Sequence, residues 1–303
     1  MGSDQFFRFA AANRPRLEEA LGVRLPVAKA PGTERFDEAL RCAVFPGGKR
    51  LRPLLTLVAS DLGGASDGQA LALSCAVEFI HTSSLLLDDL PCMDDASLRR
   101  NRPALHLAFG EGVAVLVAVA LLNQAYALLA AAARDGGRAD RLPRLIDEAV
   151  ACIGSSGMIA GQAAEFALSG ERGVRPSLAT RDLKTTALMR LVMTAGAVVA
   201  GADEADVAAL AAFGESLGRA YQVYDDLADA FGGQQATGKS AGQDSRHGRP
   251  TAVEGLSREE VGGLAEGILE GGKSALARFG GRPQAALLRS AADEIFSRLS
   301  VAP

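Results

Sequence analysis

Adjacent acidic residues end an apolar stretch of the chain, in the segment Leu85–Asp95 (LLLDDLPCMDD). The leucines predict a buried helix, and Pro91 marks its end. Carboxylates at this position are unfavourable without a cation, because the carboxyl end of a helix already carries negative partial charge. Asp88, Asp89 and Asp94 could bind Mg²⁺, which prefers carboxylate and phosphate oxygens. Taken alone, the cluster could equally be an acidic helix end in contact with water.

A second acidic cluster lies in Tyr221–Asp229 (YQVYDDLAD). Asp225 and Asp229 are four residues apart and therefore share one face of a helix, with Asp226 beside them. Like charges at this spacing repel each other by about 0.2–0.5 kcal/mol in water. Two such clusters predict two helices that face each other across a cavity, bridged by metal ions and a highly anionic ligand.

Basic residues provide the complementary charge, beginning with Gly47–Pro53 (GGKRLRP). A glycine turn allows backbone N–H groups to approach an anion while Lys49 and Arg52 hold it. The segment lacks the spacing of a Walker A loop. Each further cation alone is more often a solvated surface charge, but together they match the needs of a diphosphate site. These cations are Arg99, Arg100, Lys184, Lys239, Arg246 and Arg249.

Other chemistries find no support in the sequence. No Gly-x-Ser-x-Gly elbow, Cys/His nucleophile pair or dinucleotide fingerprint is present. The four cysteines include no CxxC pair, which favours a reducing compartment over a zinc site or disulfide scaffold. His81 lies in an apolar segment and is interpreted as a core histidine. The net charge of −4 argues against a nucleic-acid binder.

Helical patterns must position these residues. The chain has 303 residues, of which 48% are hydrophobic, and alternation typical of strands is nearly absent. Polar or glycine-rich sequence interrupts the helices at 45–53, 91–102 and 231–250. We expect an all-α protein with one domain over residues 1–303. The predicted helices are Phe36–Val44, Pro53–Leu62, Gln69–Leu87, Val113–Ala133, Leu142–Ala167, Leu178–Ala200, Glu204–Ala230 and Arg258–Phe279.

One of these segments is long enough to be considered as a membrane span. Gly112–Ala133 is apolar, but it contains Asn123 and Gln124 and is rich in alanine. We interpret it as a buried core helix. The first residues do not fit a secretory signal, so we expect a soluble cytoplasmic protein without a membrane span.

The motifs, in their order along the chain, resemble those of the trans-isoprenyl diphosphate synthases. The resemblance runs from about residue 36 to residue 250. The motifs are GGKRLRP (Gly47–Pro53), EFIHTSSLLLDDLPCMDD (Glu78–Asp95), LRR (Leu98–Arg100), GQ (Gly161–Gln162), KTTAL (Lys184–Leu188), YQVYDDLAD (Tyr221–Asp229) and TGK (Thr237–Lys239).

Within that family, the first acidic motif has the form common in bacterial farnesyl and in plant and bacterial geranylgeranyl diphosphate synthases. MDDASLRR (Met93–Arg100) and VAVALL (Val117–Leu122) are most similar to the synthases of bacterial carotenoid clusters. Many relatives have Gly-Asp where this chain has Ala118 and Val119.

The resemblance implies a fold, a reaction and site residues. The fold is a bundle of about 10–13 helices around a central cavity. The reaction joins isopentenyl diphosphate to an allylic diphosphate with Mg²⁺, about three ions per site. The family also implies a homodimer. The implied metal ligands are Asp88, Asp89, Asp94, Asp225, Asp226 and Asp229. The implied substrate-binding residues are Lys49, Arg52, His81, Arg99, Arg100, Lys184, Thr185, Gln222, Lys239 and Arg249. The implied catalytic residues are Asp88, Asp89, Arg99, Lys184, Gln222, Asp225 and Lys239.

Product length depends on which side chains close the hydrocarbon pocket. Farnesyl-forming relatives tend to have an aromatic residue five positions before the first motif aspartate, where this chain has Ser83, followed by Ser84. Small side chains there favour growth past fifteen carbons, so we expect geranylgeranyl diphosphate (C20). A farnesyl or longer-chain synthase is the near alternative. A non-catalytic regulatory partner of another synthase is disfavoured because both acidic clusters are intact, and a cyclising terpenoid synthase is disfavoured by GGKRLRP.

Overall fold

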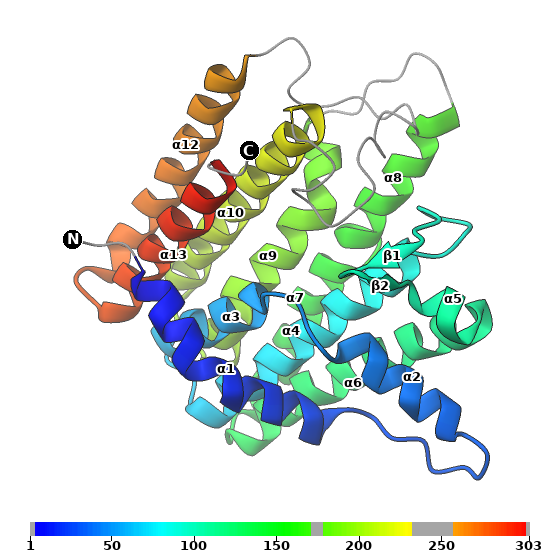
Figure 1. Cartoon of the computed structure of the whole chain (residues 1–303). Coiled ribbons are helices and arrows are strands. Elements are labelled where there is room, and N and C mark those ends of the chain that lie inside the picture. Colours follow the sequence, from blue (N-terminus) through cyan, green and yellow to red (C-terminus); the bar gives the residue numbers. More distant parts are fainter. Residues whose placement is uncertain (1–3, 171–177, 232–256, 301–303) are drawn as a thin grey trace.

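Helices form nearly all the regular structure of the residues that the structure describes (Figure 1). The computed structural model describes residues 4–170, 178–231 and 257–300, without the side chains of 165–170, 178–182, 225–231 and 298–300. The described helices and strands are α1 (Gln5–Arg24), α2 (Glu34–Val44), α3 (Leu51–Leu62), α4 (Asp67–Asp88), β1 (Leu98–Arg99), β2 (Arg102–Pro103), α5 (Leu105–Phe109), α6 (Glu111–Asp135), η1 (Ala139–Arg141), α7 (Leu142–Ile153), α8 (Met158–Gly170), α9 (Leu178–Ala200), α10 (Glu204–Phe231), α12 (Arg258–Ala275), η2 (Leu276–Phe279) and α13 (Pro283–Ser300). The predicted all-α class is confirmed.

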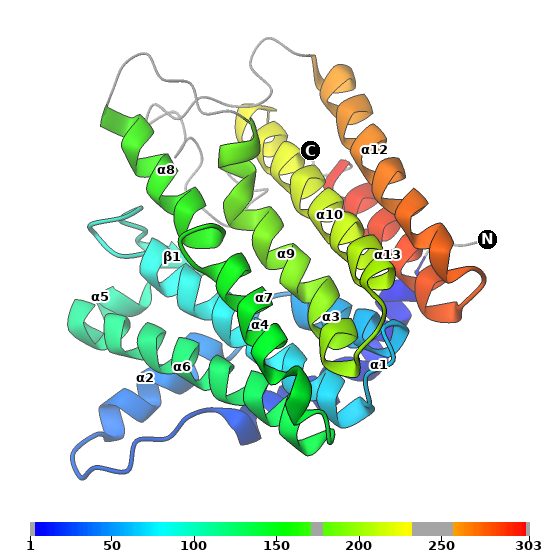
Figure 2. The same ribbon diagram turned by 180° about the vertical axis from the view of Figure 1, so that it is seen from behind.

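Helix α9 lies at the centre of the bundle and packs against α3, α4, α7, α8 and α10. In both ribbon views it runs between α8 and α10 (Figures 1 and 2). Residues 191–199 of α9 are all buried, so this stretch is covered around its whole circumference. The helices that carry the motifs are thus anchored to one buried helix.

Glycines allow the neighbouring helices to approach α9 closely. A Cβ at Gly196 of α9 would lie 2.3 Å from the Cα of Ser60 in α3, and a Cβ at Gly161 of α8 would lie 2.5 Å from the backbone N of Lys184. Distances this short exclude any larger residue without movement of the backbone. The backbones are therefore in direct contact at the core and beside a predicted site residue.

The first helix is joined to the last by a buried carboxylate. Glu294 of α13 accepts hydrogen bonds from the backbone N–H groups of Phe6 and Phe7 in the first turn of α1, each 2.9 Å long. No side chain of α1 caps this end, and Glu294 satisfies the free N–H groups instead. Burial acts to raise the pKa of Glu294, but hydrogen bonds from Ser290 and from the two N–H groups outweigh it and lower that pKa.

The structure corrects one predicted helix. Leu142–Ala167 is not continuous but forms α7 and α8, separated by Gly154–Gly157 (GSSG). Gly154 has extended backbone angles, and a Cβ at Gly157 would lie 2.2 Å from the carbonyl oxygen of Cys152. The chain turns too tightly there for a helix to continue. Sequence analysis also missed α1, α5, α13 and the short hairpin of β1 and β2, whose register pairs Leu98 with Pro103.

The prediction of a buried core helix at Gly112–Ala133 is wrong for its outer face. Helix α6 packs along α4 with residues such as Ala118 and Leu121 fully buried, but Leu116 and Val119 are more than half exposed. By length and composition, α4, α6 and residues 183–200 of α9 could each cross a membrane. Inside the protein, 72% of the apolar window is buried in α4 and in α9, against 39% in α6. Core packing therefore accounts for the apolar sequence of α4 and α9, whereas α6 also has an open apolar face.

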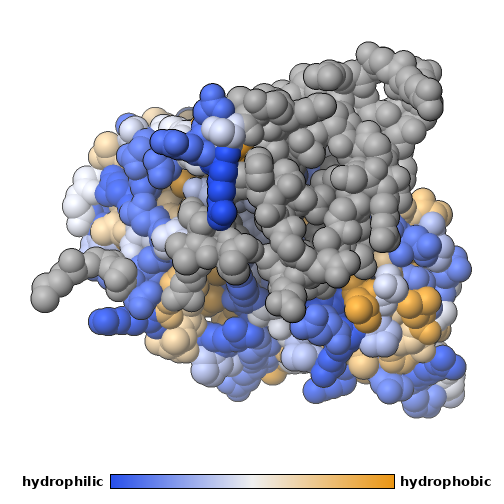
Figure 3. Space-filling view, turned by 45° about the horizontal axis from the view of Figure 1, so that its top comes forward, coloured by the Kyte–Doolittle hydropathy of each residue, from blue (hydrophilic) through white to orange (hydrophobic). Residues whose placement is uncertain are grey.

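The described surface on the face shown in Figure 3 is mostly hydrophilic. Hydrophobic residues are interspersed there with hydrophilic ones, as on ordinary protein surfaces.

We expect Gly196→Ala to destabilise the fold, because the added methyl group would meet the backbone of α3. The free energy of unfolding, measured by denaturant titration, should fall by about 1–3 kcal/mol. Gly267→Ala is the matched control, since nothing lies within 4 Å of a Cβ at that position of α12. The control should be neutral or stabilise by up to about 1 kcal/mol. Equal effects of the two substitutions would contradict the close approach of α3 and α9.

Candidate active site

Of the predicted site residues, those whose side chains the structure describes lie around the region where α4 ends, α9 begins and α10 approaches its end. The two ribbon views place these helix ends on the same side of the bundle, with β1 beside the end of α4 (Figures 1 and 2). Two contacts connect α10 with α9 and α3. Thr185 Oγ1 of α9 lies 3.4 Å from Gln222 Oε1 of α10, and the guanidinium carbon of Arg52 in α3 lies 5.9 Å from the Tyr221 ring centroid of α10. Segments that are distant in the sequence thus meet at one end of the bundle.

Asp88 forms an ion pair with Lys184, across from the end of α4 to the beginning of α9. The Lys184 Nζ lies 2.9 Å from Asp88 Oδ2, and the carboxylate is largely buried. Burial raises the pKa of Asp88, and the Lys184 ammonium limits the rise. The close approach of α8 at Gly161 supports the backbone of Lys184. A predicted metal ligand and a predicted diphosphate-binding cation are therefore neighbours.

Asp89 pairs with Arg99 of β1 through two guanidinium nitrogens. Asp89 is only 1% exposed, so this charge depends on its partner. The loop after α4 folds back on the helix: the N–H of Asp94 donates to the carbonyl of Asp88 (2.9 Å), and the N–H of Ala96 donates to that of Asp89 (3.3 Å). These bonds satisfy carbonyl groups at the helix end and keep Asp94 beside the first two aspartates.

The second acidic cluster lies on α10, as its spacing predicted. Asp225, Asp226 and Asp229 belong to this helix, but their side chains lie outside the described residues, as do Lys239, Arg246 and Arg249 entirely. Gln222, one turn earlier, is described and contacts Thr185. The roles expected for Asp225, Asp226, Asp229, Lys239 and Arg249 stay predictions.

The described residues of the first acidic cluster, Asp88, Asp89 and Asp94, show how far this part of the site fits a metal ion. Among the described side chains, no three His, Cys, Asp or Glu residues are close enough together to hold a metal ion. The donors at the end of α4 are three carboxylates within one turn and its following loop, which suit a hard divalent cation. A complete ligand set would need the carboxylates of α10 as well.

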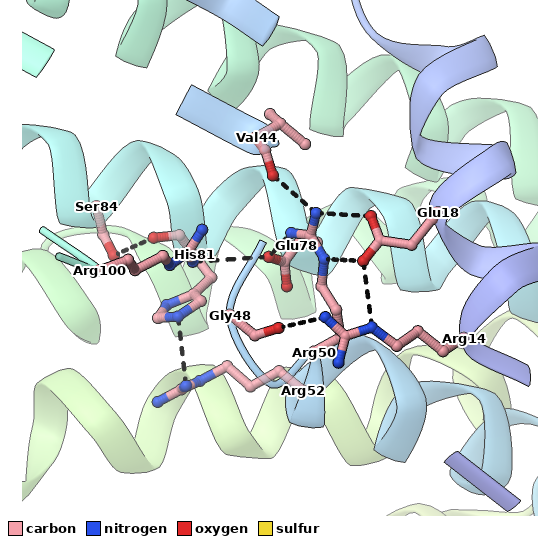
Figure 4. A network of polar contacts seen from close by, with 10 residues as sticks. All are labelled: Arg14, Glu18, Val44, Gly48, Arg50, Arg52, Glu78, His81, Ser84 and Arg100. Carbon is pink, nitrogen blue, oxygen red and sulfur yellow. Dashed lines mark hydrogen bonds and ion pairs between the residues drawn. The ribbon is translucent and has the colours of Figure 1, made fainter. Parts of the chain in front are cut away.

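The glycine turn before α3 brings a second group of cations together (Figure 4). Arg52 Nη1 lies 3.4 Å from His81 Nε2, and a Cβ at Gly48 would lie 3.4 Å from Arg100 Nε. Lys49 is exposed at the same turn. Arg52, His81 and Arg100, three of the predicted substrate-binding residues, are therefore gathered next to the turn that carries Lys49.

Comparison with known proteins identifies the family. The sequence model described as "Polyprenyl synthetase" matches residues 33–259. The chain belongs to the polyprenyl synthetase family.

Relatives and solved structures agree with this membership. The chain is 37% identical over 265 residues to a protein of Catharanthus roseus named geranylgeranyl pyrophosphate synthase, covering 87% of this chain and 72% of that one. It is 34% identical over 252 residues to the farnesyl diphosphate synthase of Bacillus subtilis, covering 83% and 84%. A geranyltransferase structure from Helicobacter pylori, complexed with magnesium and isoprenyl diphosphate, has a TM-score of 0.79 at 28% identity and 98% coverage of both chains. As a family member, this chain is a prenyltransferase that elongates prenyl chains. It has the isoprenoid synthase fold.

The two serines predicted to control chain length, Ser83 and Ser84, differ from each other in their hydrogen-bond partners. Ser83 is buried, and its hydroxyl donates to the carbonyl of Ala118 in α6, at 2.8 Å. The hydroxyl of Ser84 donates to the carbonyl of His81 in its own helix, at 2.9 Å. Ser83 and Ala118 are both small, and they face each other between α4 and α6.

Sequence reasoning placed three further residues in motifs but assigned no role to them. Glu78 and Arg50 are almost fully buried and paired with each other, and both amide atoms of Gln162 are buried without a hydrogen-bond partner among the described residues. A signal was present for Glu78, since an acid inside an apolar helical run is expensive unless it has a partner. The partners themselves could not be read from the helix pattern.

His81 is electrically neutral at pH 7, and its titration tests that arrangement. Loss of solvation, with the positive charges of Arg52 and Arg100, lowers the pKa of His81 well below its ordinary 6.5. We expect NMR signals of the His81 ring to show no titration between pH 6 and 8. Because the unfolded chain binds this proton more tightly, His81 lowers the stability of the fold as the pH falls below about 6.5.

Removing a neighbouring charge should raise this pKa. Arg52→Gln should shift the His81 titration upward, whereas Arg102→Gln in β2, which is exposed, should leave it unchanged. A titration near pH 6.5 in the unmodified protein would contradict the cationic surroundings of His81.

Proposed function

We propose that this prenyltransferase makes geranylgeranyl diphosphate (C20) by Mg²⁺-dependent, head-to-tail addition of isopentenyl diphosphate to allylic diphosphates. The observation that carries the proposal is that two adjacent arginines, Arg99 and Arg100, belong to different groups of charged residues, one at the end of α4 and one at the glycine turn. Arg99 contacts Asp89 at the end of α4, and Arg100 faces the glycine turn. The left-handed backbone of Arg100 (φ 54°) at the hairpin turn separates the two side chains. Two anionic substrates need two such groups.

The residues at the end of α4 suit the allylic diphosphate. Asp88, Asp89 and Asp94, with the aspartates of α10, would hold the metal, which when bound offsets charge on the departing diphosphate. Lys184 and Arg99 lie beside these carboxylates and can donate to diphosphate oxygens directly. Thr185, Gln222, Lys239 and Arg249 are the further groups that we assign to diphosphate binding.

The cations at the glycine turn suit isopentenyl diphosphate. Lys49, Arg52 and Arg100 supply positive charge, and neutral His81 supplies a hydrogen-bonding ring beside Arg52. Loss of diphosphate leaves an allylic cation, which the double bond of isopentenyl diphosphate attacks to form the new carbon–carbon bond. The proton lost from the isopentenyl unit goes to the released diphosphate. The apolar face of α4, including buried Leu86, helps keep water from the cation.

The position of Ser83 opposite Ala118 supports the C20 product. The segments Met93–Arg100 and Val117–Leu122 support a place beside the carotenoid-type bacterial enzymes. A relative in Catharanthus roseus bears the name of a C20 synthase, whereas one in Bacillus subtilis bears that of a C15 synthase.

A homodimer is part of the proposal. The apolar outer face of α6 and α5, with Leu107, Leu116 and Val119 each more than half exposed, is the surface that a second copy would cover. The molecular mass in solution, measured by light scattering, tests this; a monomer at micromolar concentration would contradict it.

The reaction itself is tested by incubation with Mg²⁺, labelled isopentenyl diphosphate and C5, C10 or C15 allylic diphosphates. We expect a dominant C20 product. Asp89→Asn should lower kcat by about a hundredfold or more, because the charge at the end of α4 is lost. Asp135→Asn, at the exposed end of α6, is the control and should match the unmodified enzyme. A C15 product would contradict the chain-length proposal alone, and no product with any starter would contradict the catalytic one.

The chain-length proposal predicts that Ser83→Phe shortens the product. A phenyl ring at position 83 would add bulk between α4 and α6, opposite Ala118, and so restrict the growing chain; C15 diphosphate should become the main product. Ser83→Ala is the matched control: it removes the hydrogen bond to Ala118 but adds no volume, and the C20 product should persist. Chromatography of the dephosphorylated products measures both. An unchanged distribution in Ser83→Phe would exclude Ser83 as the residue that limits length.

A further inference from the structure

A buried glutamate lies behind the cations of the glycine turn. Glu78 belongs to α4, is 2% exposed, and accepts a hydrogen bond from Arg50 Nη1. Its Oε1 also lies 4.0 Å from Arg100 Nη2. One carboxylate is thus shared by two guanidinium groups that come from different segments of the chain (Figure 4).

Arg50 uses its hydrogen-bonding capacity inside the protein. Its Nε and Nη2 donate to the two carboxylate oxygens of Glu18 in α1, each at 3.0 Å, and Nη2 also donates to the carbonyl of Val44 at 2.7 Å. With the bond to Glu78, four of the five guanidinium N–H groups have acceptors. Arg50 therefore has a structural role in the turn, and neighbouring cations supply the charge that binds diphosphate.

The hydrogen-bonded Arg50 side chain also determines the shape of the glycine turn. Arg50 has a left-handed backbone (φ 55°) at the start of α3, and its guanidinium group folds back so closely that a Cβ at Gly47 would lie 2.0 Å from it. Arg14 of α1 donates to the carbonyl of Gly48 at 2.9 Å. The positions of Lys49 and Arg52, on either side of Arg50, follow from this arrangement.

Arg100 depends on the same carboxylate. Burial lowers the pKa of Arg100, Arg50 and Arg99 lower it further, and Glu78 opposes the shift. Without the charge of Glu78, the guanidinium groups of Arg50 and Arg100 would repel each other, and the charge of Glu18 would offset only part of that repulsion. The side chain of Arg100 would then turn away from Gly48.

We propose that Glu78 is a positioning residue of the isopentenyl diphosphate site: by binding Arg50 and Arg100 together, it determines where Lys49, Arg52 and Arg100 meet the diphosphate. The inference rests on the proposed function, which places isopentenyl diphosphate at this turn. Glu78 does not touch the substrate; it acts through the two arginines.

The test compares two Michaelis constants in the Glu78→Gln enzyme. Glutamine keeps the shape of the side chain but cannot neutralise two guanidinium groups. We expect KM for isopentenyl diphosphate to rise about tenfold, while KM for the allylic diphosphate stays within about twofold and kcat within about threefold. Loss of a purely structural residue would instead lower the fraction of active enzyme and leave both KM values as they were.

Glu148→Gln is the matched control. Like Glu78, Glu148 of α7 is a carboxylate that binds an arginine; it is partly buried, contacts Arg190 and Thr194 of α9, and lies outside the site. Both of its KM values should equal those of the unmodified enzyme. A wild-type KM for isopentenyl diphosphate in folded Glu78→Gln, or the same change in Glu148→Gln, would overturn the proposal.

A shorter acid keeps the test informative if Glu78→Gln does not fold. Glu78→Asp retains the charge but loses reach toward Arg100, so KM for isopentenyl diphosphate should rise selectively, by about threefold. An unchanged value would again overturn the proposal. Calorimetric binding of isopentenyl diphosphate separates this inference from the proposed function: if the unmodified protein binds it but forms no product, the catalytic proposal fails, and the same variants should still weaken binding. If the unmodified protein does not bind it, both fail.

Discussion

Buried charge is the constraint around which the functional end of this molecule is built. Asp88 and Asp89 lie at the carboxyl end of an apolar helix, where both burial and the helix dipole disfavour a carboxylate. Lys184 and Arg99 compensate them, and each cation comes from another element. An uncompensated charge in the interior would cost far more free energy than any one of these contacts contributes. The end of α4, the beginning of α9 and the hairpin must therefore keep fixed positions relative to one another.

The packing of the bundle supplies that register. Backbone contacts at Gly161 and Gly196 leave little room for α8 or α3 to shift against α9. At the other side of the site, α1 binds the glycine turn through Arg14 and Glu18, while its first turn is capped by Glu294 of the last helix. Helices that carry no motif thus determine how accurately the motif residues meet.

Helix positions were largely predictable from the sequence, because hydrophobic periodicity is a local property. Predictions failed where the cause was not local. Leu142–Ala167 is interrupted at Gly154–Gly157 by a tight turn, although its apolar pattern continues. The outer face of α6 is exposed although its composition is that of a core helix. Helix α1 has a weak apolar pattern of its own and is held by residues of distant elements, among them Glu294.

The amino-acid sequence by itself determined the all-α class, the order of the motifs, and the residue types of both acidic clusters and the glycine turn. It thereby determined the family, because these depend on identity and spacing along the chain. Only the tertiary structure decided which charges meet: Asp88 with Lys184, Asp89 with Arg99, and Glu78 with both Arg50 and Arg100. The physical reason is that charge pairing is short-ranged, whereas the partners are brought within range by the packing of helices far apart in the sequence.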